Sequence, residues 1–496
     1  MCSRRKISTV SEVTEKTFDH EKQLTEERDW SHVRQHLAAL SANLATLSGG
    51  AAYGWTSPAL PHLQRKHPDV DHPFVVTPEE GSWIGALLPL GALFGALPAG
   101  FMAEKIGRKK SILLLALPYI LGWLCIIFAN EQLLLIYIGR FILGLALGAT
   151  TVLVPQYNEE IAEDAIRGAL GVYLDFSLCN GNLLVNLFGA LLPFTWFTVA
   201  SATLPLIFLA TFYWMPESPV YLVLGNRMEE ATKSLAWLRK GRSSYDIQGE
   251  LKYLKETLTM ESGEEEESIV TLIRSLLRNG LSSSFTTLKT LAIVYVLVFF
   301  QQTQGIDAIN FYSVVIFMKS GVGIPPNVSS VILCLCQSAS DLFSALFVDR
   351  IGRKPMLLMS AAMTTVSQAT LSVFFHCKDH RIEIHSYNWV PLAAMIVFVV
   401  GYTLGFSPLP WLMMNELVPT KMKSWVNSGA VCMNWSLVFL VSKEFPAMEF
   451  HLGRDVTYGI FSIMCLCSFV FVFMWVPETK GKSRQEIQEA LRGDKK

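Results

Sequence analysis

Amide side chains stand in a segment of the chain that is otherwise apolar. Gln301, Gln302 and Asn310 fall within residues 290–318, among Val, Leu, Ile and Phe. Burying an amide is costly unless it finds hydrogen-bond partners, and an amide both donates and accepts, as sugar hydroxyls do. Gly305 lies between them and predicts a break that lets the helix bend around a ligand. The pattern predicts a site for a polyhydroxylated solute, with hydrogen bonding between helices as the alternative.

Three aspartates also lie in apolar segments. They are Asp175, Asp307 and Asp341, whereas Arg140 is the basic residue clearly inside such a segment. An ionised carboxylate is expensive within a membrane and is functional by default. One base cannot neutralise three acids, so at least one Asp is expected to be protonated, to face water or to pair with substrate. Arg140, Asp175 and Asp341 therefore form a candidate proton or charge site. Pairing of either acid with Arg140, or a hydrogen bond to a neighbouring helix, is the alternative.

Acids and bases recur together at the ends of the apolar segments. EKIGRK at residues 104–109 returns as DRIGRK at 349–354, and PES at 216–218 returns as PET at 477–479. Opposite charges from both halves of the chain can meet there in pairs that close one side of the molecule and then separate, because an exposed pair stabilises by only about 1 kcal/mol or less. Anchoring of the bases on one side of a membrane is the alternative. The predicted gating charges are Glu104, Arg108, Glu160, Arg167, Glu217, Asp349, Arg353, Glu416 and Lys423.

A proline-rich interruption marks another apolar segment, residues 389–414. Pro408 and Pro410 free backbone carbonyl groups there and predict a hinge. Trp411, beside them, offers an indole ring to stack on a sugar ring and one N–H donor, with simple packing as the alternative. Gln337 and Asn434 are further amides in apolar segments.

The elements that hold these residues are long apolar helices. Of 496 residues, 51% are hydrophobic and 17% are charged, which is low for a soluble protein. About 20 apolar residues are needed to cross a bilayer. Segments of that kind lie at 35–57, 82–103, 111–129, 132–155, 168–192, 195–215, 290–318, 327–348, 355–376, 389–414, 424–442 and 456–476. The sequence therefore predicts an all-α membrane protein with twelve transmembrane helices.

The repeated motifs divide these helices into two homologous sets of six. Lys and Arg concentrate in the loops that share a side with both termini, which places both termini in the cytoplasm. Two six-helix repeats about an axis along the membrane normal are a transporter architecture with the solute site between them. The predicted parts are a cytoplasmic N-terminal tail (1–34), an N-terminal bundle (35–215), a cytoplasmic linker with short helices (216–289), a C-terminal bundle (290–476) and a cytoplasmic C-terminal tail (477–496).

Eight motifs in order give the chain a family resemblance over residues 35–490. They are GFMAEKIGRKK from Gly100, GRFILG from Gly139, PQYNEEIAEDAIRG from Pro155, PESP from Pro216, QQTQGIDAINFYS from Gln301, DRIGRK from Asp349, PLPWLMMNEL from Pro408 and PETKGKS from Pro477. The chain resembles the sugar porter family of the major facilitator superfamily. Thr56 to Leu60 and Asn434-Trp435 are similar to the arthropod branch related to facilitated trehalose and hexose transporters.

The resemblance implies roles for individual residues. Gln301, Gln302 and Asp307 occupy positions where the family contacts sugar, with Asp307 in place of the usual Asn. Trp411, Gln337 and Asn434 also match positions around the site, as does Asp175, where many hexose carriers have Gln. Thr56 stands where proton-coupled members commonly have Asp, which favours gradient-driven movement.

We therefore expect a facilitative carrier of a hexose or a trehalose-like disaccharide that works by alternating access. The alternatives are a proton-coupled symporter that uses Asp175 or Asp341 and a sensor that binds sugar without transporting it. The short segment after Pro477 argues against the sensor. The sequence shows no nucleotide loop, metal cluster or nucleophile–base pair, so we expect no enzyme activity, cofactor or metal. The expected partners are the sugar and the lipid bilayer, not nucleic acid, and we expect a monomer in the plasma membrane.

Overall fold

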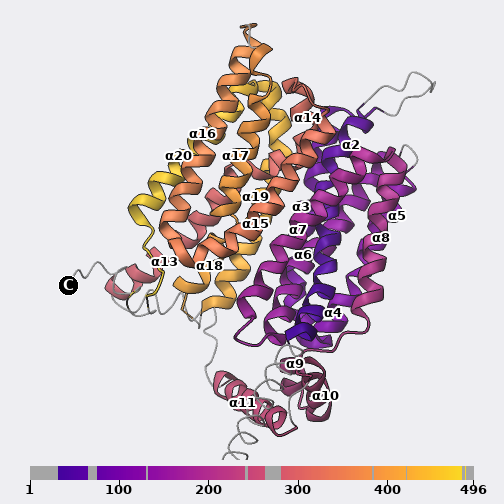
Figure 1. Ribbon diagram of the computed structural model, residues 1–496, viewed down its shortest axis with the longest axis vertical. Coiled ribbons are helices and arrows are strands. Elements are labelled where there is room, and N and C mark those ends of the chain that lie inside the picture. The colour runs from indigo at the N-terminus through magenta and orange to yellow at the C-terminus, as the bar shows by residue number, and fades with distance from the viewer. Residues whose placement is uncertain are drawn as a thin grey trace, which may run out of the picture.

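The computed structural model describes residues 32–64, 75–129, 132–240, 244–262, 281–382, 385–419, 422–482 and 486, and within them the chain is all-helical. The first 31 residues and most of the segment after residue 482, which the sequence assigns to the tails, lie outside this described part. Figure 1 shows two helical bundles side by side, with three short helices set apart at one end.

The first bundle holds the helices of the N-terminal half. A helix at residues 32–54 leads through Trp55 into α2. The others are α2 (Thr56–Leu63), α3 (Pro78–Ile106), α4 (Arg108–Leu114), α5 (Ala116–Ile127), α6 (Leu133–Ile161), α7 (Arg167–Leu191) and α8 (Phe194–Phe212). The start of α3 is a capping box, in which the Thr77 side chain accepts from the Glu80 amide and the Glu80 carboxylate accepts from the Thr77 amide.

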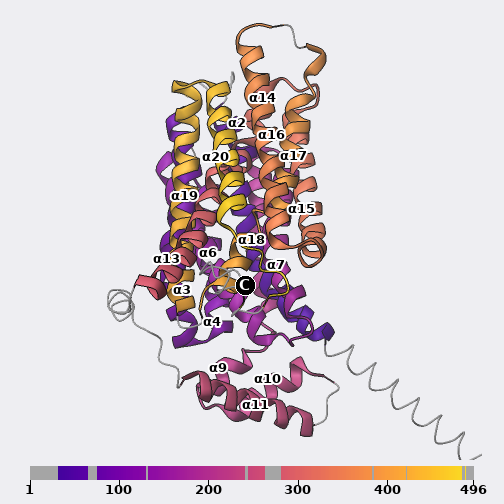
Figure 2. The ribbon, with the colours of Figure 1, turned by 90° about the vertical axis from the view of Figure 1, so that its left-hand side faces the viewer.

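The short helices α9 (Pro219–Leu224), α10 (Met228–Leu238) and α11 (Ser244–Ser262) follow the first bundle. They pack on one another through Leu222, Val223 and Ala231 and lie beyond one end of the bundles (Figures 1 and 2). We call this end of the molecule the linker side and the other end the far side.

The second bundle holds α13 (Leu281–Thr303), α14 (Ile306–Ser320), α15 (Pro326–Ile351), α16 (Arg353–Asp379), α17 (Val390–Leu404), α18 (Leu409–Leu417), α19 (Lys423–His451) and α20 (Arg454–Trp475), with a 3-10 turn at His385–Tyr387. Two of the expected spans are broken, as the sequence predicts. Gly305 separates α13 from α14 with a φ of +91°, a conformation that favours glycine, and residues 405–408 separate α17 from α18.

Nine stretches of the described residues are long and apolar enough to cross a membrane. The other three expected spans, 35–57, 168–192 and 327–348, coincide with the helix at 32–54, with α7 and with α15. These three helices are more polar; α7, for example, carries an aspartate and three asparagines. The outer surfaces of the bundles expose large apolar side chains such as Phe101, Trp214 and Phe473, as lipid-facing helices do. The count of twelve spans remains a prediction.

The two bundles meet along three pairs of helices. Helix α3 packs against α19, α7 against α15, and α2 against α14. The last pair lies on the far side, where Figure 1 shows α2 and α14 close together. Of the broken helices, α14 therefore lies where the two halves of the chain meet, whereas α13, α17 and α18 pack within the second bundle.

Candidate functional site

The breaks in the C-terminal half face each other. Gln301, near the end of α13, donates a hydrogen bond from Nε2 to the carbonyl oxygen of Ser407, between α17 and α18, at 2.9 Å. Gln302 donates from Nε2 to Asn434 Oδ1 on α19 at 2.5 Å. The side-chain oxygens of both glutamines are buried and have no hydrogen-bond partner among the described residues. These two acceptors are therefore available to donors such as the hydroxyl groups of a solute.

Asp307 connects the two halves of the chain. Its Oδ1 accepts a hydrogen bond from the hydroxyl of Tyr53, at the end of the helix at 32–54, at 2.6 Å. Its Oδ2 is buried and has no hydrogen-bond partner within the described residues. Asp307 Oδ2 is therefore a third available acceptor, in addition to the side-chain oxygens of the two glutamines. One turn along α14, Asn310 Oδ1 accepts from Asn182 Nδ2 on α7 at 3.4 Å. Tyr53 and Asn182 could not be singled out from the sequence, since neither differs in type from many structural residues of membrane helices.

More hydrogen bonds join the halves toward the far side. The hydroxyls of Ser57 and Ser313 lie 2.7 Å apart, and the Ser330 hydroxyl donates to Asn186 Oδ1 at 2.8 Å. The Trp83 ring lies 6.3 Å from that of Phe439 on the opposite half. The hydrogen bonds that join the two halves form a polar seam. The residues of this polar seam are 53, 57, 182, 186, 307, 310, 313 and 330.

Asp175 and Asp341 interact with each other across α7 and α15. The Asp341 carboxyl accepts a hydrogen bond from the thiol of Cys179, and it interacts electrostatically with the Asp175 carboxyl. Its Oδ2 is buried without a hydrogen-bond partner within the described residues. Tyr402 on α17 is hydrogen-bonded to Gln301 and interacts electrostatically with Asp175 and Asp307, so it links these acids to the glutamine. The sequence predicted the acids but missed Tyr402 and Cys179.

Arg140 is fully buried and binds the first helices of the chain. Its guanidinium donates to the carbonyl oxygens of Ile84 at 2.9 Å and Ala52 at 2.5 Å, and to Thr56 Oγ1 at 2.8 Å. The guanidinium carbon also lies 5.6 Å from the centre of the Trp55 ring. Its hydrogen bonds therefore hold the helix at 32–54, α2 and α3 together, whereas Asp341 interacts electrostatically with Asp175.

Two further predicted binding residues lie in the second bundle. Gln337 is buried on α15, and Trp411 is half-buried on α18 and packs against the core. Packing was the alternative that the sequence left open for Trp411, and a contact with sugar remains a prediction.

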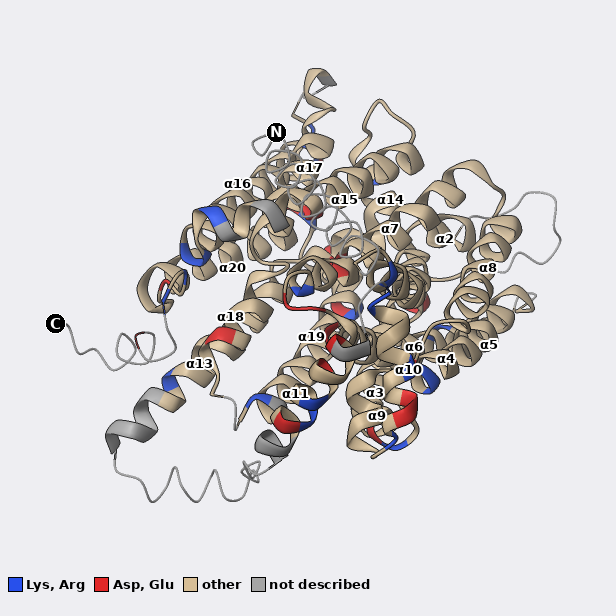
Figure 3. Cartoon of the chain, turned by 60° about the horizontal axis from the view of Figure 1, so that its bottom comes forward, with Lys and Arg blue, Asp and Glu red and all other residues tan. Residues whose placement is uncertain are grey.

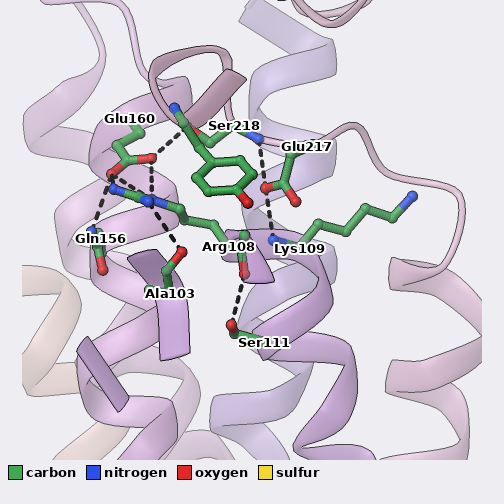
Figure 4. Close-up of polar contacts among 10 residues, drawn as sticks. Ala103, Arg108, Lys109, Ser111, Gln156, Glu160, Glu217 and Ser218 are labelled. Atoms are coloured by element: carbon green, nitrogen blue, oxygen red, sulfur yellow. Dashed lines mark hydrogen bonds and ion pairs between the residues drawn. The ribbon is translucent and has the colours of Figure 1, made fainter. Parts of the chain in front are cut away.

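A cluster of charges holds the linker-side ends of the first bundle (Figure 4). Arg108 Nε lies 2.9 Å from both carboxylate oxygens of Glu160, and its Nη1 donates to the Ala103 carbonyl oxygen at 3.1 Å. The Ser218 hydroxyl also binds Glu160. Glu217 accepts from the backbone amide of Lys109 at 2.8 Å. Figure 3, with the linker side turned forward, shows acidic and basic residues gathered at these helix ends.

The second bundle repeats this cluster. Arg353 Nη2 lies 3.0 Å from Glu416 Oε1, and its Nη1 donates to the Val348 carbonyl oxygen at 3.3 Å. Glu478 accepts from the backbone amides of Arg353 and Lys354, each at 3.1 Å. The repeated motifs therefore build equivalent sites in which an arginine binds an acid and a second acid caps the next helix.

The two capping acids differ in their surroundings. Burial raises the pKa of the Glu217 carboxyl, and the amides of Lys109 and Ser218 only partly offset it. Burial acts in the same direction on Glu478, but the backbone amides that donate to it, from Lys480 and the start of α16, hold its pKa below the usual value.

The remaining predicted gating charges lie outside these clusters. Arg167 is exposed and pairs with Asp164 at 3.1 Å, Glu104 is exposed, and Lys423 is half-buried at the start of α19. The side chain of Asp349 lies outside the described residues. Each of the two arginine clusters contains charges of one half of the chain, so a meeting of charges from both halves remains a prediction.

Two packed helical bundles, with broken helices and buried acceptors that lack partners within the described residues, are the architecture of a solute transporter. A family model described as "Sugar (and other) transporter" matches residues 11–491. The chain belongs to this family, and it is an integral membrane transporter and not an enzyme.

Similar proteins include the facilitated trehalose transporter Tret1 of Apis mellifera ligustica, 34% identical over 93% of this chain and 89% of that one. Tret1 of Anopheles gambiae is 35% identical over 94% of this chain and 56% of its own length. Among solved structures, an inward-open conformation of the xylose transporter XylE from E. coli has a TM-score of 0.73 at 20% identity, covering 91% of this chain and 98% of that one.

Proposed function

We propose that the protein is a facilitative carrier of a hexose or a trehalose-like disaccharide. The observation that carries the proposal is a set of buried acceptors at the broken helices. They are Oε1 of Gln301, Oε1 of Gln302 and Oδ2 of Asp307, which have no hydrogen-bond partner in the part of the chain that the structure describes. Sugar hydroxyls supply the donors that these atoms lack. The similar proteins named as facilitated trehalose transporters support the same class of substrate.

Transport would proceed by alternating movement of the two bundles around this site. In the structure the polar seam joins the halves toward the far side, so the sugar would enter or leave from the linker side. Opening the far side requires the seam to separate, while Arg108–Glu160 and Arg353–Glu416 keep the helix ends of each bundle together. We place the linker side in the cytoplasm of a plasma-membrane protein that acts as a monomer. The concentration of Lys and Arg in the linker-side loops supports that orientation.

Proton-coupled symport is the second candidate function. It is favoured by the electrostatic interaction between Asp175 and Asp341. It is also favoured by Asp341 Oδ2, which has no hydrogen-bond partner within the described residues and can accept a proton. Against it stands Thr56, which presents a hydroxyl rather than a carboxylate to Arg140.

Uptake into proteoliposomes tests both candidates. Labelled glucose, trehalose and xylose are offered with and without a proton gradient to the wild type, Asp175→Asn and Asp341→Asn. We expect a hexose or trehalose to equilibrate across the membrane without accumulating. Uphill accumulation driven by the gradient and lost in either Asn variant would favour symport. Saturable transport of no sugar would refute both candidates.

A further inference from the structure

Two histidine rings pack against each other in a tilted arrangement at the far-side end of α16. His376 and His380 are one helical turn apart, and their ring centres are 4.2 Å apart with 32° between the ring planes. Residues at positions i and i+4 share one face of a helix. Figure 1 shows this end of the second bundle projecting away from α9–α11, at the opposite end of the molecule from the charge clusters.

Hydrogen bonds determine which nitrogen of each ring carries the proton. His376 Nδ1 lies 2.8 Å from Asp455 Oδ2, and His380 Nδ1 lies 2.9 Å from the carbonyl oxygen of His376. Because a carboxylate and a carbonyl oxygen accept hydrogen bonds, both Nδ1 atoms act as donors. A neutral imidazole protonated on Nδ1 has its lone pair on Nε2. Each ring therefore keeps one nitrogen that can bind a metal ion.

The same arrangement orients the histidines of known metal sites, in which one ring nitrogen donates to a carboxylate or carbonyl and the other binds the metal. Nearby cations have partners of their own. Arg454 binds Asp379, and Lys378 Nζ donates to the carbonyl oxygens of Lys319 and Ser320 at 2.9 and 2.6 Å. These charges are thus engaged away from the two rings.

We propose that His376 and His380 form a two-histidine site for Zn²⁺ or a similar borderline divalent metal, with Asp455 as a positioning residue. Imidazole nitrogen suits such ions. Within the described residues no group of three or more His, Cys, Asp and Glu side chains could hold a metal, so water completes the coordination. His376 lies in α16 and His380 is the residue that follows its last turn, so both ligands belong to one bundle. The bound metal therefore leaves the two halves free to move.

The first test is a titration of the full chain, purified in detergent without a polyhistidine tag, with ZnCl₂ in a calorimeter near neutral pH. We expect one saturable site. His376→Gln and His380→Gln should each abolish it, and Asp455→Ala should weaken it about tenfold, as loss of an orienting partner does. His451→Gln is the matched control, because His451 is an exposed histidine at the end of α19 and should leave binding unchanged.

A second measurement makes the result independent of folding defects in the variants. Electron paramagnetic resonance of the wild type with one equivalent of Cu²⁺ should show coupling to two imidazole nitrogens, and sugar uptake by both Gln variants should match the wild type. Zinc binding that persists in the double variant His376→Gln and His380→Gln would overturn the proposal, as would wild-type protein that binds no zinc at a saturable site.

Discussion

Arg140 Nη2 donates a hydrogen bond to Thr56 Oγ1 at 2.8 Å, inside the first bundle. Both residues are fully buried, so the guanidinium has no water to replace a lost acceptor. We predict that Thr56→Val, which keeps the shape but removes the hydroxyl, destabilises the protein by about 1–3 kcal/mol, the cost of an unpaired buried donor. Thr56→Ser retains the acceptor and should stay close to the wild type. Thermal unfolding in detergent compares the two, and equal midpoints would contradict the role assigned to this contact.

Gln302 is predicted to contribute to sugar affinity. Gln302→Ala removes the Nε2 bond to Asn434 and the unpartnered Oε1, so about 1 kcal/mol of binding free energy, or several-fold in affinity, should be lost. The measurement is equilibrium binding of the best-transported sugar. Asn180→Ala serves as the control, because the Asn180 amide bonds to the Phe176 carbonyl oxygen in its own helix. A similar affinity in all three proteins would remove Gln302 from the site.

Two of the three arginines predicted as gating charges, Arg108 and Arg167, should differ in their effect on stability. Arg108 is 5% exposed and holds Glu160, so Arg108→Ala leaves a carboxylate without its partner and should cost about 3–5 kcal/mol. Arg167 pairs with Asp164 at the surface, and Arg167→Ala should cost less than about 1 kcal/mol. Denaturant unfolding of the two variants measures the difference. If the two variants lost similar free energy of unfolding, the burial of Arg108 would not contribute to the stability of the protein.

Gly107 allows Glu217 to reach the start of α4. A Cβ atom at Gly107 would lie 2.5 Å from Glu217 Oε2, and its φ of +99° disfavours other residues. We therefore predict that Gly107→Ala lowers the unfolding temperature. Gly249, on α11, has nothing within 4 Å of its Cβ position. Gly249→Ala should stabilise that helix by roughly 0.5–1 kcal/mol, because alanine favours a helix over glycine. If Gly249→Ala lowered the unfolding temperature as much as Gly107→Ala does, the loss at Gly107 could not be assigned to its backbone conformation.

The course of the helices could be predicted from the sequence because each span is a local property of about 20 residues. The break at Gly305 and the interruption before Pro410 could be predicted for the same reason, since glycine and proline act on their own backbone. The equivalent clusters around Arg108 and Arg353 were indicated by repeated motifs, although their partners were not. Glu217 and Glu478 bind backbone amides, and a backbone amide has no signature in the sequence.

The contacts between helices were harder to predict. Tyr53 reaches Asp307, and Cys179 reaches Asp341, only because two helices from different halves cross with particular rotations. Periodicity within one span does not determine those rotations when apolar residues cover every face. Arg140 illustrates the same limit, because its partners include the carbonyl oxygens of Ala52 and Ile84.

The composition of the polar seam sets how readily the molecule changes shape. Its contacts are hydrogen bonds, such as Ser57 to Ser313 and Ser330 to Asn186, and water can replace each of them when the halves part. A hydrogen bond exchanged for water changes the free energy by only about 0.5–1.5 kcal/mol. The closed and open forms are thus separated by a shallow free-energy difference. A solute that binds one form more tightly than the other by a few kcal/mol is enough to reverse the populations of the two forms. Solute binding alone can therefore drive the change from one form to the other.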